Sequence, residues 1–258
     1  MNTLAATMIQ TPLYWEDKAK NIALFDSLLS AMQSPGDFIV LPEMFTTAFS
    51  MNRSLAEPME GETVTWMKRK AAALQTPICG SVMIVDEGNY YNRFVWVNPD
   101  GSLQFYNKRH LFRMANEHDH FTAGNNRILI ELNGWKLFPV VCYDLRFPVW
   151  LRRTPQFDYD AMIVVANWPE RREQHWRILL QARAIENQSY VVAVNRVGED
   201  GNGLNYSGYS GILSPKGEWI TALPNDASVI RVEMSRQELM DWRTNFPAAN
   251  DADSFTLA

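Results

Sequence analysis

The chain alternates short apolar runs with segments in which apolar residues recur every three or four positions. Apolar runs bounded by turn residues are typical of strands, and the wider spacing is typical of helices with one buried face. The spacing predicts helices over 17–32, 61–75, 171–187 and 235–242. The apolar runs predict strands over 4–10, 38–41, 78–85, 91–97, 102–107, 128–132, 136–142, 161–166, 190–195, 211–213, 218–222 and 228–233.

The second half of the chain repeats the order of elements in the first half. Each half has a strand, a helix, a strand and then a hairpin, and turn residues at 99–101 (Pro-Asp-Gly) and 214–217 (Ser-Pro-Lys-Gly) close the two hairpins. We therefore predict an α/β protein in which two sheets pack face to face with helices outside, a four-layer α-β-β-α sandwich. The alternative is one doubly wound sheet with helices on both faces.

The composition predicts one large domain over residues 1–258. Of all residues, 47% are hydrophobic and 21% are charged, which excludes a disordered chain. Gly and Pro are spread along the sequence instead of gathering in a linker. For a folded chain of this size we expect an accessible surface of about 11,500 Å².

The net charge of −5 argues against nucleic acid as a partner, because phosphate binding requires clustered Lys and Arg. The densest basic run is Arg171, Arg172, Arg177 and Arg183, interleaved with glutamates. We interpret this run as the solvated face of a helix. The sequence has no long apolar run for a membrane span and no signal peptide, so we expect a cytoplasmic protein without a membrane partner.

The two cysteines have different sequence surroundings. Cys142 ends an apolar run and precedes a polar turn. At such a position the free N–H groups of a helix start stabilise a thiolate or an oxyanion. A small buried residue is an equally good interpretation of Cys142. Cys79 lies inside a predicted strand without charged neighbours, and we interpret it as structural.

Glu43 and Lys108 also follow predicted strands. Glu43 lies among apolar residues, a setting typical of a carboxyl group that transfers protons, although a solvated rim carboxylate fits equally well. Lys108, taken alone, is interpreted as surface charge. His118 and His120 have the spacing of a metal-binding pair, but no other residues complete a tetrahedral site. We therefore interpret them as part of a solvated loop and expect no metal and no cofactor.

Several segments, in this order, resemble the nitrilase superfamily of carbon–nitrogen hydrolases. They are LPEMF at 41–45, NKRHLF at 107–112, VCYDLRFP at 141–148 and ARAIEN at 182–187. The resemblance implies an α-β-β-α sandwich of the nitrilase type in which Glu43, Lys108 and Cys142 are catalytic. It also implies that Glu117 is a second catalytic carboxylate, which positions Lys108 or assists proton transfer, and that the backbone N–H of Tyr143 binds the oxyanion.

Within the superfamily, EMFTTAFSM at 43–51 and VANWP at 165–169 resemble the omega-amidase branch. This resemblance implies hydrolysis of the terminal amide of short dicarboxylate monoamides, such as 2-oxoglutaramate and succinamate, through a cysteine thioester. One departure is Tyr209, where relatives commonly have an acid or another polar residue. The open alternatives are another C–N substrate (an N-carbamoyl amine, a nitrile or deaminated glutathione) and a binding subunit without catalysis.

A substrate with a free carboxylate favours an arginine in the site, because the guanidinium group matches a carboxylate with two parallel hydrogen bonds. Arg146, Arg53 and Arg196 are the candidates, and the sequence does not rank them. Arg146 is equally well interpreted as a structural partner of Asp144. The remaining residues expected at the pocket either form its wall or are core aromatics: Trp168 and Phe49.

The resemblance also implies an assembly, because members of the family usually pair through helices near the nucleophile and through the C-terminal tail. Here the tail, over about 243–258, carries aromatic residues that need a partner surface. We expect at least a homodimer with this tail in the subunit contacts.

Overall fold

Two β-sheets form the centre of the protein. The structure is a computed structural model that describes residues 2–257. The first sheet has the strand order β13-β1-β2-β3-β4-β5, with β1, β2 and β3 parallel and the other neighbours antiparallel. Its strands are β1 (Thr3–Gln10), β2 (Phe38–Val40), β3 (Ile78–Asp86), β4 (Asn89–Val97), β5 (Leu103–Asn107) and β13 (Ser228–Ser235).

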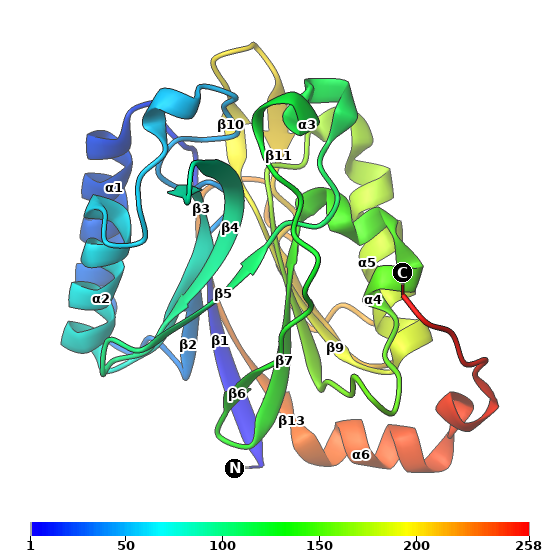
Figure 1. The fold of residues 1–258 in the computed structure, drawn as a ribbon. Helices are drawn as coiled ribbons and strands as arrows, with labels where there is room; N and C mark the ends of the chain where they lie inside the picture. Colours follow the sequence, from blue (N-terminus) through cyan, green and yellow to red (C-terminus); the bar gives the residue numbers. More distant parts are fainter. Residues whose placement is uncertain (1, 258) are drawn as a thin grey trace.

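The second sheet has the strand order β12-β9-β8-β7-β6. The three central strands are parallel, and the two edge strands are antiparallel to their neighbours. Its strands are β6 (Ile130–Leu132), β7 (Trp135–Val141), β8 (Ala161–Ala166), β9 (Tyr190–Asn195) and β12 (Gly211–Leu213). A separate ribbon of β10 (Val197–Glu199) and β11 (Asn205–Ser207) lies at the top of Figure 1.

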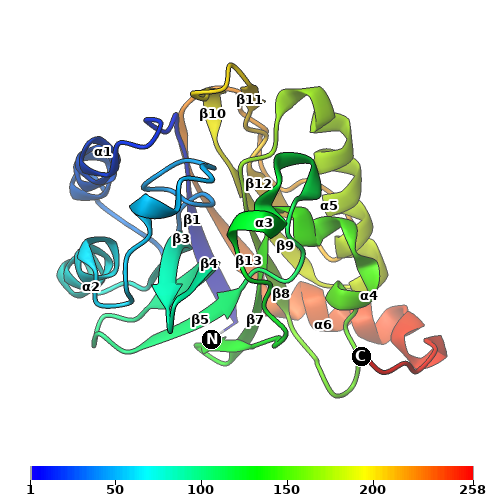
Figure 2. The same cartoon turned by 45° about the horizontal axis from the view of Figure 1, so that its top comes forward.

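Helices cover the outer face of each sheet (Figures 1 and 2). α1 (Lys18–Ser30) and α2 (Glu62–Leu74) lie outside the first sheet. α4 (Pro148–Leu151) and α5 (Glu173–Asn187) lie outside the second, and α6 (Arg236–Asn245) lies at the lower end in Figure 1. The layers are helix, sheet, sheet and helix. The predicted four-layer α-β-β-α sandwich is therefore confirmed, and the single doubly wound sheet is wrong.

The alternation of side chains along β2 explains the layers. Phe38 and Val40 point into the core between the two sheets, whereas Ile39 packs with residues of α1 and α2. Successive side chains of a strand point to opposite faces, so a strand covered on both sides must be apolar throughout. This is why the run before Glu43 is uniformly hydrophobic.

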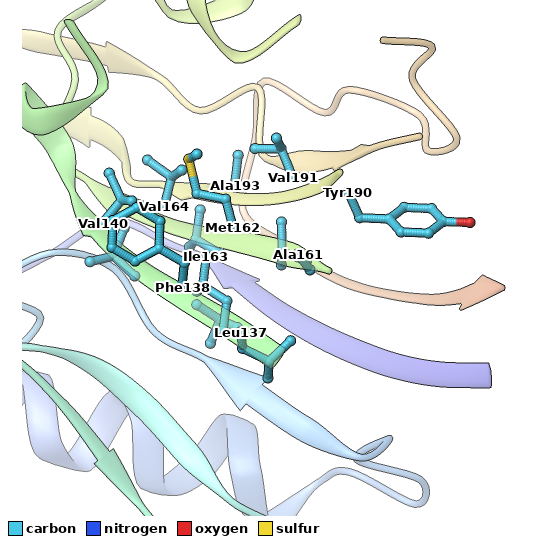
Figure 3. Close-up of a cluster of buried hydrophobic side chains, with 14 of the residues drawn as sticks. Leu137, Phe138, Val140, Ala161, Met162, Ile163, Val164, Tyr190, Val191 and Ala193 are labelled. Atoms are coloured by element: carbon cyan, nitrogen blue, oxygen red, sulfur yellow. The ribbon is translucent and has the colours of Figure 1, made fainter. Parts of the chain in front are cut away.

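The second sheet follows the same rule (Figure 3). Phe138 of β7 pairs in register with Met162 of β8, which pairs with Val191 of β9, and all three are fully buried. The apolar run of β7 continues to Val141 and stops there. Cys142 is therefore the residue at which the chain leaves the core.

The structure departs from the predicted elements in three places. Residues 218–222 form only an isolated bridge between Leu213 and Trp219, because the Thr221 hydroxyl accepts the Ile212 N–H that a longer strand pair would use. The helix predicted over 171–187 begins at Glu173, after the 3₁₀ turn η4 (Glu170–Arg172). The short elements α3 (Glu117–His120), β10 and β11 carry no periodic pattern and escape prediction.

The apolar residues of the chain form the buried core. The accessible surface is 11,055 Å², close to the expectation of about 11,500 Å². Within residues 2–257, we find no helix that combines the length and the hydropathy needed to cross a bilayer.

Candidate active site

Polar residues gather where strands of both sheets end. Glu43 follows β2, Lys108 follows β5, Cys142 follows β7 and Asn167 follows β8. The carboxyl ends of parallel strands are the usual position of sites in α/β proteins. The Glu43 carboxylate accepts from Lys108 Nζ of its own sheet at 2.8 Å. It also joins the two sheets, because it accepts from the backbone N–H of Asn167 at 2.8 Å.

Lys108 forms ion pairs with two carboxylates. Its Nζ lies 2.8 Å from Glu43 Oε1 and 2.9 Å from Glu117 Oε2, and the side chains of all three residues are fully buried. The backbone N–H of Phe112 also donates to Glu117 Oε2, at 2.6 Å. Removing one partner from a buried ion pair leaves an uncompensated charge, so each group holds the others in place.

Cys142 begins the 3₁₀ turn η3 (Cys142–Arg146) directly after β7. Its φ is +45°, a left-handed conformation that is uncommon outside glycine and is concentrated at functional sites. Asp144 fixes this turn, because it accepts the backbone N–H of Val141 at 3.2 Å and that of His110 at 2.8 Å. Asp144 therefore connects the turn that carries Cys142 to the loop that follows Lys108.

The charges of the cluster shift the pKa values of its members. Burial raises the pKa of the Cys142 thiol well above its ordinary value, Glu43 raises it further and Lys108 opposes the shift. Burial lowers the pKa of Lys108, but Glu117 and Glu43 outweigh this and the pKa is raised. Burial raises the pKa of Glu117, Lys108 opposes this and Glu43 adds to it. At neutral pH the cysteine is therefore a thiol and the lysine is a cation.

Two asparagines complete the cluster, and sequence reasoning missed both. Asn92 Nδ2 donates to Glu43 Oε1 at 2.8 Å and to Glu117 Oε1 at 3.2 Å. Asn167 Nδ2 donates to the backbone carbonyl of Glu43 at 2.6 Å. Two features of the sequence could have indicated them. Asn92 is an amide within a largely apolar strand, and Asn167 is an amide directly after an apolar run.

Known proteins have sequences similar to that of this chain. Residues 5–244 match the sequence model of the carbon-nitrogen hydrolase family. The chain is 48% identical over 258 residues to the omega-amidase YafV of Escherichia coli strain K12, with 100% of both chains covered. It is 30% identical over 247 residues to the 2-oxoglutaramate amidase of Bacillus subtilis strain 168, covering 94% of this chain and 95% of that one. This chain belongs to the carbon-nitrogen hydrolase family.

A solved structure agrees with this assignment. XC1258 of Xanthomonas campestris, a CN-hydrolase superfamily protein, matches with a TM-score of 0.97 at 42% identity, and 100% of both chains is covered. The resemblance to the nitrilase superfamily and its omega-amidase branch is therefore confirmed, and the protein is an enzyme that hydrolyses C–N bonds.

A cavity of about 520 Å³ lies beside Cys142 in this hydrolase. Phe49, Tyr143 and Trp168 form part of its wall. Lys108 Nζ lies 5.1 Å from the centroid of the Phe49 ring, so this ring lies beside both the buried ion pairs and the cavity. A volume of this size suits a small-molecule substrate.

The three candidate arginines have different positions in the hydrolase. Arg146 lines the cavity. Arg196 is buried outside the cavity wall and donates to backbone carbonyls, including that of Glu199 at 2.8 Å, and Arg53 stacks over Tyr90. The interpretation of Arg146 as a partner of Asp144 is wrong, because other groups donate to the Asp144 carboxylate: Tyr106, His110 and Val141.

The basic run is only partly a solvated face, so that interpretation is corrected. Arg171 and Arg177 are exposed, as expected, and Arg171 also lines the cavity. Arg183 is buried and donates to the Leu145 carbonyl at 2.8 and 3.0 Å. Arg172 lines the cavity, because α5 begins one residue later and leaves Arg172 in the preceding turn.

The other residues weighed from the sequence lie apart from the cavity. Cys79 is fully buried in the core, as predicted. Tyr209 lies outside the cavity wall, with the Arg177 guanidinium 5.3 Å from its ring centroid. His118 and His120 belong to α3, and within residues 2–257 no three His, Cys, Asp or Glu side chains are grouped to hold a metal ion.

Proposed function

We propose that this hydrolase is an amidase that converts the terminal amide of small dicarboxylate monoamides, such as 2-oxoglutaramate and succinamate, to the dicarboxylate and ammonia. The observation that carries the proposal is the buried cluster of Glu43, Lys108 and Glu117 beside Cys142, which itself lines a small cavity. The names of two relatives, an omega-amidase and a 2-oxoglutaramate amidase, support the substrate class.

In the proposed acylation step, Glu43 takes the proton from Cys142 as the sulfur attacks the amide carbon. The new C–S bond forms while the carbonyl π electrons move onto oxygen. The Lys108 ammonium and the backbone N–H of Tyr143, which is free because it belongs to the first turn of η3, stabilise this oxyanion. Because the pKa of Cys142 is raised, the thiol keeps its proton until a base acts, which gives Glu43 its role.

The intermediate then collapses. Glu43 transfers the proton to the leaving nitrogen, the C–N bond breaks, and ammonia departs from a thioester on Cys142. Water gives a proton to Glu43 and attacks the thioester carbon. The C–S bond breaks, the sulfur takes the proton back, and the dicarboxylate leaves. Glu117 acts as a positioning residue, because its contacts are to Lys108, Asn92 and Phe112.

Ammonia release by the purified full chain tests this function. The panel contains succinamate, 2-oxoglutaramate, butyramide, an N-carbamoyl amine and a nitrile. Deaminated glutathione, whose hydrolysis releases a dipeptide and no ammonia, is followed by mass spectrometry of the products. We expect the first two to be hydrolysed fastest, and mass spectrometry of acid-quenched reactions to show an acyl group on Cys142. Faster turnover of the nitrile or the N-carbamoyl amine contradicts the substrate class. Turnover with an unmodified Cys142 throughout contradicts the thioester.

We also propose that the enzyme is at least a homodimer, with residues 243–258 in the subunit contacts. Ile178 and Ile185 on α5, and Phe246 and Phe255 in the tail, are exposed, and such groups favour a partner surface. Light scattering should give at least twice the chain mass of 29.6 kDa, and a chain ending at Asn245 should dissociate more readily. A monomeric full chain contradicts this proposal.

We place the enzyme in the cytoplasm. Cys79 and Cys142 are both free in the structure, and the proposed mechanism requires Cys142 as a thiol. A reducing compartment keeps thiols in that state. Cell fractionation that recovers the native enzyme outside the cytoplasm contradicts this placement.

A further inference from the structure

Three arginines line the cavity, and of these Arg171 is exposed, whereas the other two are partly buried and have no acidic partner in the described part of the chain. Arg146, four residues after Cys142, and Arg172, in η4, both line the cavity. Neither takes part in an ion pair within residues 2–257, whereas Arg153 and Arg183 both do. A cation beside a ligand cavity without its own counterion is available to an anionic ligand.

Aromatic rings hold both guanidinium groups. That of Arg146 lies 4.7 Å from the ring centroid of Trp168, and its Nη2 is 3.2 Å from His175 Nδ1. That of Arg172 lies 5.3 Å from the ring centroid of Phe112. Stacking occupies the face of a guanidinium and leaves N–H groups at its edge for a planar carboxylate. The two side chains are therefore oriented before a ligand arrives.

Arg146 and Cys142 both act on the charge of Arg172. Burial, Arg171 and Arg146 lower the pKa of Arg172, while Cys142 raises it. Two acidic residues of the wall form no ion pair with either arginine and accept hydrogen bonds from their own neighbours instead: Glu16 and Asp200. An anion between the arginines would relieve their repulsion.

We infer that Arg146 and Arg172 together bind the free carboxylate of the substrate while Cys142 attacks the amide at its other end. The inference rests on the proposed function and assigns its specificity to two residues, of which Arg172 was interpreted from the sequence as a surface charge. A neutral amide leaves both partly buried cations unpaired, so the cavity selects against it.

The measured quantity is the ratio of kcat/KM for succinamate to that for butyramide, which has a methyl group in place of the carboxylate. We expect Arg172→Gln and Arg146→Gln to lower this ratio about 10- to 100-fold, mainly through KM for succinamate. Arg172→Lys should recover part of the loss, because lysine keeps the charge without the fork. The matched control, Arg177→Gln, removes an exposed arginine outside the cavity wall and should leave the ratio unchanged.

A binding measurement separates this inference from the proposed function. In a Cys142→Ala background, calorimetric titration with succinamate should show binding that Arg172→Gln weakens by a similar factor. If both glutamine variants leave the ratio unchanged, because kcat/KM falls equally or not at all for the two substrates, the inference that the two arginines bind the carboxylate is overturned. The amidase proposal then still stands. A wild type that hydrolyses no amide overturns the proposed function, whereas the titration still reports on the pair.

Discussion

The two cysteines lie in opposite kinds of surroundings within one sandwich. Cys79, the second residue of β3, belongs to the core, and burial alone raises the pKa of its thiol. Cys142 follows β7 and borders the cavity, and Glu43 and Lys108 act on its pKa in opposite directions in addition to burial. We expect reactivity to depend on the charges near a thiol where a strand ends, because desolvation raises the pKa of both thiols.

The strand that carries Cys79 contributes to the site two residues further on. The Ser81 hydroxyl donates to Asn92 Oδ1 and accepts the backbone N–H of Met44, each at 2.8 Å. Asn92 in turn donates to Glu43. One strand therefore builds the core at Cys79 and supports the charged cluster at Ser81. The two cysteines differ in the same way, because Cys79 lies within β3 and Cys142 directly follows the end of β7.

The largest expected difference is in activity. Cys142→Ala should lower kcat at least about 10⁴-fold, because it removes the proposed nucleophile, while Cys79→Ala should keep kcat within a factor of two or so. Ammonia release at saturating succinamate measures both. Substantial steady-state activity in Cys142→Ala would show that the covalent scheme is wrong, and a similar loss in both variants would erase the contrast between the two sites.

The next effect concerns the charged neighbours that Cys79 lacks. Lys108→Met and Glu43→Gln should each lower kcat by about 10²- to 10⁴-fold, because one removes an oxyanion donor and the other the acid–base group. Lys136→Met is the control, since Lys136 is exposed on β7. Circular dichroism confirms that each variant is folded before kcat is compared. Loss below tenfold in both cluster variants is incompatible with their proposed roles.

The sequence predicts the elements and site residues that depend on a local pattern, and it fails for those that depend on contacts between distant segments. The residues of β8 (Ala161–Ala166) and β9 (Tyr190–Asn195) match the predicted runs, because a strand buried on both faces has a continuous apolar pattern. Glu43 and Cys142 were recognisable as polar residues directly after such runs. Their proposed roles rest on the ordered resemblance, since neither position alone distinguished a catalytic residue from a structural one.

What escaped prediction depends on the assembled sandwich. The pattern of arginines and glutamates around Arg172 is that of a solvated helix, and only the later start of α5 places this side chain at the cavity. Asn92 joins Glu43 to Glu117, which are 74 residues apart in the sequence, so no local pattern indicates its contacts. Such residues are determined by tertiary contacts and not by periodicity.

A smaller effect is expected in the pH dependence of alkylation by iodoacetamide, which reports the thiolate. Glu43 raises the pKa of Cys142, so Glu43→Gln should move the midpoint of alkylation to lower pH. Lys108 lowers that pKa, so Lys108→Met should move the midpoint to higher pH. Mass spectrometry of the intact chain measures the rate at each pH, with Cys142→Ala reporting any reaction at Cys79. Shifts of the same sign in the two variants contradict the opposed charges.

The smallest expected effect is on stability. Cys79→Ala removes a sulfur from a fully buried core position and should cost about 1 kcal/mol, which corresponds to a Tm lower by about 2–4 °C. Cys142→Ala removes a sulfur that borders the cavity, so no closed void forms and Tm should fall by less. Thermal denaturation followed by circular dichroism compares the two variants under one condition. If Cys142→Ala lowers Tm as much as Cys79→Ala does, the sulfur of Cys142 is packed like a core atom. The two cysteines then differ only in the charges around them, and access to the cavity does not distinguish them.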